Sequence, residues 1–395
     1  MKSLKELNLS GRRVLVLTDL STCFHNALDN SVDDRCLRRA LLTIKLILEK
    51  GGSPIVISHL GGPEETHEHR YSLKPLAAKL GDFLNCDVRF TADYVGAEVE
   101  GMTRELEPGQ VLLLENLNYH PGERNNDPQF CRQLVRLADV FINDAFPVAH
   151  CKYASTLGIP RLFKEKALGL SVERELEFHE KALLAPKRPL CVVLGGLKVS
   201  KSSNLLVNLA QRADKFILGG VPGNTFLAAQ GIQMGRSKFE QDCLPKILEL
   251  LGVLARRECK VYLPVDLMTG PAANAKGLAR VAPTQEFPAD MMALDIGPAS
   301  SILFKEALQS SGTIFWCGPL GVWENEEYAK GTTDLIENIA ASHGVKVAAG
   351  GDTCAAIRQM QLEHKFDFIS TGGSTFLMLL EGRNLPALDA MVMEE

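Results

Sequence analysis

The sequence has no long apolar run and no surplus of positive charge. No hydrophobic stretch approaches the ~20 residues that span a bilayer, which argues against a membrane-embedded protein. Residues 1–6 lack the apolar core of a signal peptide, and the formal net charge of −5 leaves no basic excess for the phosphates of a nucleic acid. We therefore expect a cytoplasmic protein that binds neither membranes nor nucleic acids.

Paired cysteines are also missing. The ten cysteines form no C-x-x-C pair and no Cys/His cluster, so neither a disulfide framework nor a zinc site is indicated. Cysteines in apolar runs, such as Cys191, are expected to be reduced core residues. Cys36, Cys151 and Cys317 are of more interest because they fall among candidate site residues.

Short apolar runs alternate with helix-periodic stretches along all 395 residues, a length that favours two domains. Such runs are typical of parallel strands buried on both faces, with crossover helices between them. They are residues 14–17, 54–58, 111–114 and 141–142 in the first half, and residues 191–194, 215–218, 260–264, 313–316 and 346–349 in the second. The pattern predicts an α/β protein with two Rossmann-like parallel-sheet lobes. A segment that runs to Leu184, with Ser171 as its expected N-cap, predicts a helix between the lobes, either a hinge or a plain surface helix.

Glycine-rich segments follow three predicted strands of the second half. Gly195-Gly196-Leu197-Lys198 lets a ligand approach the backbone and supplies a lysine, and Gly350-Gly351-Asp352-Thr353 opens a helix. Backbone N–H groups at such a helix N-terminus hold phosphate oxygens, and Asp352 is a candidate Mg²⁺ ligand. The third segment, Cys317-Gly318-Pro319-Leu320-Gly321, leads to Glu324, a carboxylate suited to a ribose hydroxyl. Each segment alone is a weak signal, but together they predict nucleotide binding.

Five further motifs carry a resemblance to a known family. They are Ser58-His59-Leu60-Gly61, Leu113-Leu114-Glu115-Asn116-Leu117, Asn143-Asp144-Ala145-Phe146, Leu294-Asp295-Ile296-Gly297-Pro298 and Ser370-Thr371-Gly372-Gly373. In order and spacing the chain resembles the phosphoglycerate kinases from about residue 10 to its C-terminus. The resemblance implies a monomeric, bilobed enzyme whose first lobe holds 3-phosphoglycerate and whose second lobe holds MgATP or MgADP. Hinge closure then allows phosphoryl transfer between a carboxylate and the nucleotide.

The resemblance also implies domain boundaries and site residues. The expected lobes are residues 1–170 plus 380–395 and residues 188–379, joined by an interdomain helix of residues 171–187. Lys198 and Gly351 are the expected catalytic residues, and Asp352 is the expected metal-linked carboxylate. The expected nucleotide contacts are Gly195, Gly196, Lys198, Gly219, Gly220, Pro319, Glu324, Gly350, Gly351, Asp352 and Thr353. The resemblance assigns Asp19, Ser21, His59, Asn118 and His150 to the acid pocket.

The chain departs from the family at the substrate-binding arginines. The matching positions hold Leu17, Cys36, Gly62, Asn118 and Cys151, and an asparagine of the same pocket becomes Ser21. In the second half the departures are Ser202, Val221, Cys317 and Ser374. Each arginine contact to an anion contributes roughly 1.5–3 kcal/mol, so losing two of them weakens binding on the order of a thousandfold. We therefore expect poor activity on 3-phosphoglycerate.

Three functions remain open. The first is a kinase that phosphorylates a different, less anionic carboxylic acid, favoured by the presence of Lys198, Asp352, Thr353 and Glu324. The second is a pseudokinase that binds nucleotide without phosphoryl transfer, favoured by changes in both halves, Ser202 included. The third is a structural or partner-binding protein, which the intact glycine loops argue against.

Overall fold

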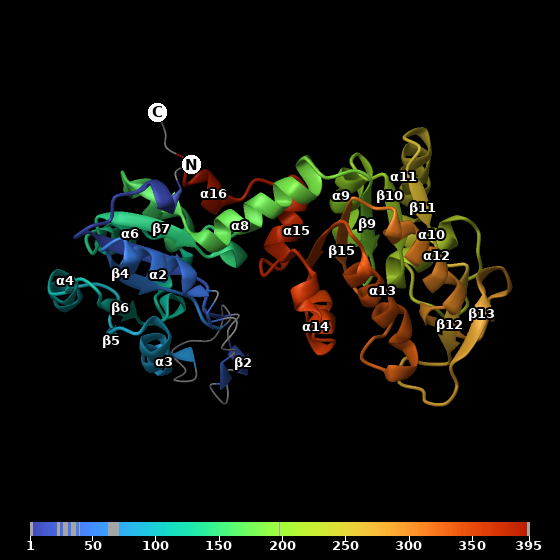
Figure 1. Ribbon diagram of the computed structural model, residues 1–395, viewed down its shortest axis with the longest axis horizontal. Helices are drawn as coiled ribbons and strands as arrows, with labels where there is room; N and C mark the ends of the chain where they lie inside the picture. The colour runs from blue at the N-terminus through green and yellow to red at the C-terminus, as the bar shows by residue number, and fades with distance from the viewer. Residues whose placement is uncertain are drawn as a thin grey trace. The chain divides into compact units, whose positions relative to one another are not determined.

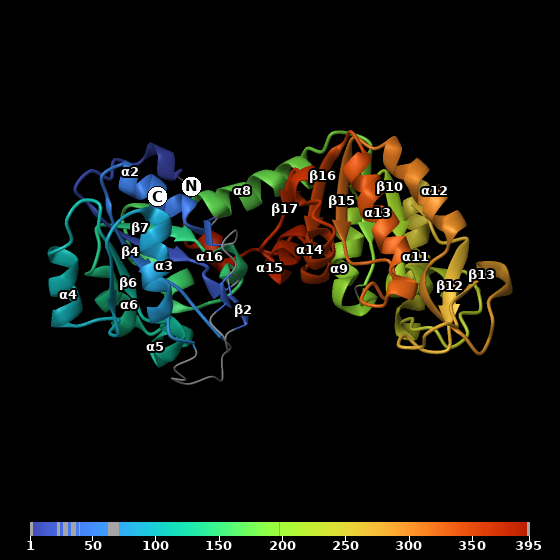
Figure 2. The same ribbon diagram turned by 60° about the horizontal axis from the view of Figure 1, so that its bottom comes forward.

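The computed structural model describes residues 3–21, 24–26, 31–32, 37–38, 40–61, 71–196 and 198–392. The chain forms two compact units, each with a sheet flanked by helices (Figures 1 and 2). Unit 1 contains Met1–Leu176 and Asn384–Glu395, and unit 2 contains Glu177–Arg383. The chain passes from unit 1 to unit 2 within helix α8 (Leu170–His179).

Unit 1 is built on a six-stranded parallel sheet with the strand order β5-β6-β4-β1-β7-β8. Its strands are β1 (Arg13–Thr18), β4 (Ser53–Ile57), β5 (Val88–Thr91), β6 (Val111–Leu114), β7 (Val140–Asp144) and β8 (Lys166–Leu168). A short antiparallel pair, β2 (Phe24–Asn26) and β3 (Ser31–Val32), lies outside this sheet. The helices of the unit are α2 (Leu42–Glu49), α3 (Lys74–Leu84), α4 (Ala97–Arg104), α5 (Pro121–Arg124), α6 (Pro128–Val135), α7 (Ile159–Leu162), the first part of α8, and α16 (Pro386–Asp389).

Both faces of this sheet are buried, as the apolar runs predict. Val14, Val16 and Ile142 belong to a core on one face together with Ile44 of α2 and Leu80 of α3. The alternate positions Leu15, Leu17, Ile55 and Phe141 are also fully buried, so the opposite face is covered as well. A strand buried on both faces must be apolar throughout, which explains why periodicity of two is missing from these runs.

Unit 2 contains a second six-stranded parallel sheet, with the order β11-β10-β9-β15-β16-β17. Its strands are β9 (Leu190–Leu194), β10 (Lys215–Leu218), β11 (Lys260–Tyr262), β15 (Thr313–Cys317), β16 (Val345–Ala349) and β17 (Phe368–Ile369). The helices are α9 (Val199–Ala210), α10 (Gly220–Ala229), α11 (Leu244–Arg256), α12 (Pro298–Gln309), α13 (Lys330–Ala341), α14 (Gly351–Gln359) and α15 (Ser374–Leu380). The predicted α/β fold with two parallel-sheet domains is confirmed.

A small antiparallel sheet in unit 2 is an addition that the sequence patterns did not predict. It has the order β13-β12-β14 and consists of β12 (Asp266–Gly270), β13 (Arg280–Pro283) and β14 (Met292–Ile296). Leu267 of β12 packs with Leu227 of α10, Met234 and Phe287 in a separate apolar cluster. The cluster fixes this sheet against α10, where it borders the site described below.

The start of α8 differs from the sequence prediction. The helix begins at Leu170, so Ser171 lies inside the first turn, and its prediction as N-cap is wrong. Asp144, at the end of β7, accepts hydrogen bonds from the backbone N–H (2.7 Å) and the hydroxyl (3.0 Å) of Ser171. A side chain at Gly169 would overlap the Asp144 carboxylate, so a glycine is required there. The cap is therefore supplied by a residue 27 positions earlier in the chain.

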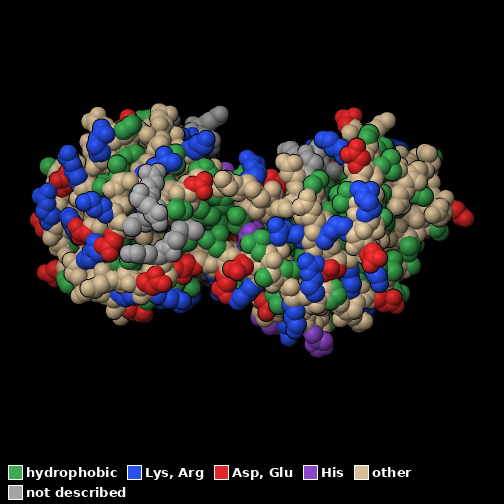
Figure 3. Space-filling view, turned by 90° about the horizontal axis from the view of Figure 1, so that it is seen from above, with side chains coloured by type: hydrophobic (Ala, Val, Ile, Leu, Met, Phe, Trp, Pro, Cys, Tyr) green, Lys and Arg blue, Asp and Glu red, His purple; other side chains and the backbone are tan. Residues whose placement is uncertain are grey.

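The surface is polar and mixed in charge. On the face shown in Figure 3, Lys and Arg side chains are interspersed with Asp and Glu instead of gathering in one basic area. In the part of the chain that the structure describes, no helix has the length and hydropathy required for a membrane crossing.

Replacing Asp144 with asparagine tests the cap at α8. Burial raises the pKa of Asp144 from 3.8 to about 7, although hydrogen bonds from Thr43, Ser171 and Val172 oppose the shift. Between these two pH values the folded state binds more protons than the unfolded state, so this carboxyl makes the free energy of unfolding fall as pH rises. We expect the stability of the wild type relative to Asp144→Asn to fall by about 3 kcal/mol between pH 4 and pH 7.

Chemical denaturation at several pH values, followed by circular dichroism, measures this difference. Asp139→Asn is the matched control, because Asp139 lies in the same unit beside Arg13 and its pKa is lowered, burial being outweighed by the Arg13 hydrogen bonds and charge. Its stability difference is expected to stay constant above pH 5. A constant difference for Asp144→Asn as well would show that Asp144 caps the helix as an anion throughout.

Candidate functional site

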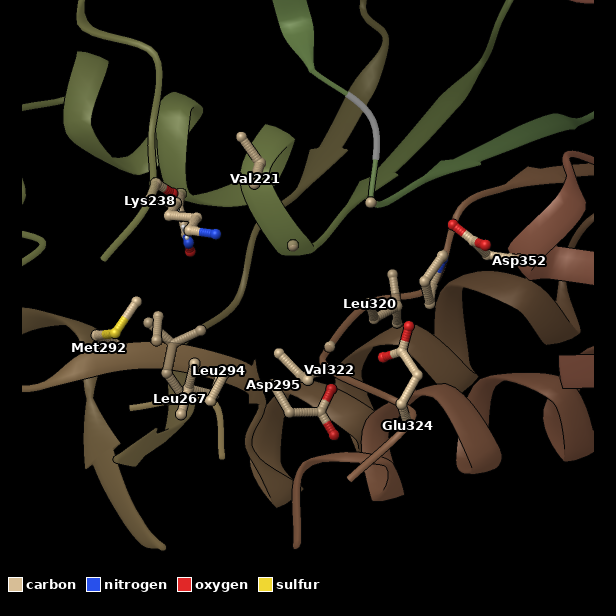
Figure 4. A pocket seen from close by; sticks show the side chains of 17 residues that line it. Val221, Lys238, Leu267, Met292, Leu294, Asp295, Leu320, Val322, Glu324 and Asp352 are labelled. Carbon is tan, nitrogen blue, oxygen red and sulfur yellow. Dashed lines mark hydrogen bonds between the residues drawn. The ribbon is translucent and has the colours of Figure 1, made fainter. Parts of the chain in front are cut away.

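A cavity of about 390 Å³ lies in unit 2, beside the loops that follow β9, β10 and β15 and the first turn of α14. In an open parallel sheet, ligands bind beyond the carboxyl ends of the strands, and this cavity occupies that place. Figure 4 shows its lining. The lining residues are Gly196, Gly220, Val221, Asn224, Lys238, Leu267, Ala273, Met292, Ala293, Leu294, Asp295, Pro319, Leu320, Gly321, Val322, Glu324 and Asp352.

Three strand-end loops are locked together at this cavity. A side chain at Gly195 would overlap the carbonyl oxygen of Pro319, and one at Gly318 would overlap the carbonyl of Gly195. The backbones after β9 and β15 therefore touch, which only glycine permits. Thr353 in α14 joins the third loop, because its hydroxyl oxygen accepts a hydrogen bond from the Gly318 N–H at 2.7 Å.

Three helices begin at this edge of the sheet: α9 follows strand β9, α10 follows β10 and α14 follows β16. Gly220 and Gly350 have positive φ values of 56° and 98°, which turn the chain from strand to helix. The N-terminus of a helix carries partial positive charge and free N–H groups, so this edge of the sheet suits phosphate oxygens. The fold thus places the predicted glycine loops between the strand ends and the first turns of these helices.

The predicted nucleotide residues divide into two groups. Gly196, Gly220, Pro319, Glu324 and Asp352 line the cavity directly. The others lie in the surrounding loops without lining it: Gly195, Lys198, Gly219, Gly350, Gly351 and Thr353. Among them Lys198 is exposed at the position that precedes α9, while Thr353 is fully buried.

The opposite wall of the cavity was not predicted. It comes from the small antiparallel sheet and its neighbours, which contribute Leu267, Met292 and Leu294 together with Asn224 and Lys238. The motif Leu294-Asp295-Ile296-Gly297 marked one strand of this wall as part of the resemblance, but it gave no role to its side chains. Lys238 and Met292 have no local signal, since each is a single residue in a loop or at a strand start.

Asp295, in β14, stabilises this wall through hydrogen bonds of its carboxylate. Its carboxylate accepts hydrogen bonds from the backbone N–H groups of Gly331 (2.6 Å) and Ile296 (2.9 Å). Side chains at Gly321 and Gly331 would overlap the carboxylate, so two glycines leave room for it. Burial raises the pKa of Asp295 to about 7, and the charge of Asp334 adds to the shift. These contacts fix β14 to the loop after β15 and to α13.

A magnesium ion fits this site only together with a nucleotide. Among the described residues, no three His, Cys, Asp or Glu side chains come together as a metal cluster. Mg²⁺ at nucleotide sites is bound by one or two carboxylates, waters and phosphate oxygens, so a single exposed carboxylate is enough. Asp352 lines the cavity in the first turn of α14 and meets that requirement.

In unit 1, the predicted His59 is part of a buried hydrogen-bonded group. Its Nε2 lies 3.0 Å from Glu123 Oε1 and 3.3 Å from Ser155 Oγ, and the Ser155 hydroxyl donates to Glu123 at 2.6 Å. Glu123 and Ser155 are fully buried, and His59 is 7% exposed. Because a buried carboxylate and a hydroxyl already engage Nε2, this ring atom serves the packing of the loop.

Asn118 and Asp19 are also held by hydrogen bonds within unit 1. The Asn118 side-chain amide donates to the carbonyl oxygens of Gly61 (3.0 Å) and Leu60 (3.3 Å). Asp19 accepts hydrogen bonds from the N–H (3.0 Å) and the hydroxyl (2.6 Å) of Ser21. Leu17, at one of the matched arginine positions, is fully buried in β1. None of these three side chains supplies a positive charge.

The loop after β7 contains Cys151 and His150, whose sulfur and Nε2 lie 3.6 Å apart. Burial raises the pKa of the Cys151 thiol and of the Tyr153 phenol, and the charge of Arg124 opposes both shifts. The thiol is therefore neutral near pH 7, and Arg124, at the end of α5, is a cation whose charge acts on both groups.

Cys36 and Gly62, the other matched positions, lie outside the described residues. Arg38, a nearby arginine, lies over the ring of Phe83 in α3, 4.4 Å from its centroid. In unit 2, Cys317 is fully buried, and burial raises its pKa to about 12, so it is a core thiol.

Comparisons with known proteins agree with the fold and the motifs. The family model for phosphoglycerate kinase matches residues 4–383. The chain is 42% identical to the phosphoglycerate kinase of Desulfotalea psychrophila over 99% of this chain and 100% of that protein. It is 39% identical to that of Aquifex aeolicus, over 98% of this chain and 97% of that protein.

Solved structures show the same similarity. The structure of phosphoglycerate kinase from Coxiella burnetii superposes with a TM-score of 0.90 at 34% identity, covering 99% of this chain and 98% of that chain. The structure from Pyrococcus horikoshii has a TM-score of 0.80 at 27% identity, covering 99% and 98%. Sequence, site loops and fold therefore agree over nearly the whole length: the chain belongs to the phosphoglycerate kinase family.

Proposed function

We propose that this protein transfers a phosphoryl group between a magnesium-bound nucleotide and the carboxylate of a small acid, and that it acts poorly on 3-phosphoglycerate. One observation carries the proposal: the nucleotide cavity of unit 2 retains its glycine loops, Glu324 and Asp352, while Asn118 and Cys151 of unit 1 supply no positive charge. The family works with ATP or ADP and Mg²⁺, which sets the class of co-substrate.

The residues of unit 2 then have distinct roles. Backbone N–H groups at the start of α14, Gly351 included, hold phosphate oxygens, and Asp352 binds the metal that accompanies them. Glu324 takes a ribose hydroxyl. Lys198 is exposed and carries the charge that neutralises the transferring phosphoryl group, whose negative charge spreads over its oxygens in the transition state.

The acid in this proposal carries less negative charge than 3-phosphoglycerate. Asn118 bonds to carbonyl oxygens of the loop after β4, and the Cys151 thiol is neutral. Arg124 acts on Cys151 and Tyr153 through its charge, and Lys152 is a second cation of the same loop. A monocarboxylic acid without a phosphate group therefore fits this loop better than a triply charged one.

The second candidate is nucleotide binding without phosphoryl transfer. It is favoured by the same lack of charge on Asn118 and Cys151, because a family member that no longer holds an acid can still bind nucleotide. A coupled assay with ATP or GTP and a panel of small monocarboxylic acids separates the two. Acid-dependent nucleoside diphosphate release supports the kinase, and nucleotide binding without turnover on any acid supports the second candidate.

Lys198→Ala tests the catalytic assignment. We expect it to lower kcat by at least about a hundredfold, since a charge aimed at the transferring group stabilises the transition state by several kcal/mol. The Kd for nucleotide, measured by calorimetry, should change by less than about threefold, since the effect is confined to the transferring group. Lys246→Ala, which removes an exposed lysine from α11, is the matched control. Undiminished turnover in Lys198→Ala would remove this residue from the mechanism.

A thermal-shift titration tests whether unit 1 binds phosphate-containing or sulfate anions only weakly, as proposed. With 3-phosphoglycerate or sulfate at millimolar concentration, we expect a Tm shift below about 1 °C, because weak binding adds little stability. Cys151→Arg should enlarge the shift with 3-phosphoglycerate, since one charge-assisted contact contributes roughly 1.5–3 kcal/mol. The control is Cys86→Arg, which adds the same charge at another half-buried cysteine of unit 1. A shift of several degrees in the wild type would contradict the proposal.

A further inference from the structure

The nucleotide cavity contains a lysine at one end. Of the described residues that line the cavity, Lys238 is the one cation. Figure 4 shows Lys238 and Met292 at one end and Asp352 at the other, with the ammonium group of Lys238 directed into the space between them. The charge is therefore separated from the strand-end loops that suit phosphate.

The two ends of the cavity suit different parts of a nucleotide. Asp352 and the start of α14 mark the phosphate end, and Glu324 lies beside them (Figure 4). The other end is lined by Leu267, Met292 and Leu294, whose apolar side chains suit the faces of a purine ring. A lysine at this end meets the edge of the base.

The backbone of Lys238 is fixed on both sides. The carbonyl oxygen of Lys238 accepts a hydrogen bond from Asn224 Nδ2 at 3.1 Å, and the preceding residue, Ser237, accepts one from the Ala293 N–H at 2.8 Å. Further along, the N–H of Glu240 donates to the Thr225 hydroxyl at 3.2 Å. The segment is thus tied to α10 and to β14, so that only the lysine side chain itself is free to adapt to a base.

The donors and acceptors at this end discriminate between purines. Adenine is read by an asparagine or glutamine amide that accepts from N6 and donates to N7, whereas guanine O6 and N7 are both acceptors and pair with a lysine or arginine. Asn224 is 4% exposed and one of its two amide N–H donors is already bound to the Lys238 carbonyl, so little of this amide is open to an adenine base. The Lys238 ammonium can only donate hydrogen bonds. The N6 amino group of adenine is also a donor, so these two groups do not pair.

We propose that Lys238 makes this cavity a site for 6-oxopurine nucleotides, those of guanine or hypoxanthine, in preference to adenine nucleotides. The Lys238 ammonium donates to O6 and N7 of the base, while the apolar wall contacts its faces. This inference rests on the proposed function in one respect, namely that the cavity of unit 2 binds a nucleotide.

Calorimetric titration of the full chain with MgGDP, MgIDP and MgADP tests the preference. We expect GDP and IDP to bind about tenfold more tightly than ADP, because a good bidentate contact discriminates by ~1–3 kcal/mol and 1.4 kcal/mol is tenfold. IDP lacks the 2-amino group of guanine, so equal binding of GDP and IDP would show that O6 and N7 are read. ADP binding equal to or tighter than GDP would overturn the inference while leaving nucleotide binding in place. No binding of any of the three would instead overturn the proposed function, and this inference with it.

Lys238→Met separates the role of this residue from that of the cavity. Methionine keeps an unbranched side chain and removes the charge, so we expect the preference for GDP and IDP to disappear while ADP binds as before or more tightly. Lys305→Met, at an exposed position on α12 outside the cavity, is the matched control and should leave all three affinities unchanged. An unaltered preference for GDP in Lys238→Met would assign base recognition to another residue and overturn the role of Lys238.

Discussion

The loops after β9 and β15 touch backbone to backbone, with Gly195 against Pro319 and Gly318 against Gly195. No side chain fits at either glycine, and the Thr353 hydroxyl adds α14 to the same contact. Because these loops belong to central, hydrogen-bonded strands, their positions follow from the sheet register. The side of the cavity at the strand ends is thus fixed by the backbone of the sheet, whereas its opposite wall is formed by the small antiparallel sheet and its neighbours.

The sequence predicted the elements whose signals are local. Apolar runs such as residues 14–17 and 111–114 are buried parallel strands. A strand that is buried on both faces has to consist of apolar residues, so its sequence alone identifies it. The cap of α8 could not be predicted, since Asp144 reaches Ser171 across the fold, and the serine next to the helix start was the wrong candidate. The wall with Lys238 and Met292 was missed for the same reason: three short strands and a loop meet only in the folded unit.

The two units differ in how their polar residues are used. In unit 2, Glu324 and Asp352 line a cavity and are exposed, as residues that meet a ligand must be. In unit 1, Asn118 bonds to carbonyl groups of a neighbouring loop, and His59 meets a buried carboxylate. Hydrogen bonds within unit 1 therefore hold these loops in place without a bound ligand.

The C-terminal segment completes unit 1 from the far end of the chain. Lys166, buried in β8, donates to the carbonyl oxygens of Pro160 and Ala390, and the Ala387 N–H donates to Ala149. Without residues 384–392 the Lys166 ammonium would lose its hydrogen bond to Ala390. Loss of a buried hydrogen bond lowers the free energy of unfolding, which is small for a typical domain. During synthesis, residues 3–176 leave the ribosome long before residues 384–392, which complete the same unit, have been made. Unit 2, which is continuous in sequence, can therefore finish folding first, and the unit that starts the chain is the last to close.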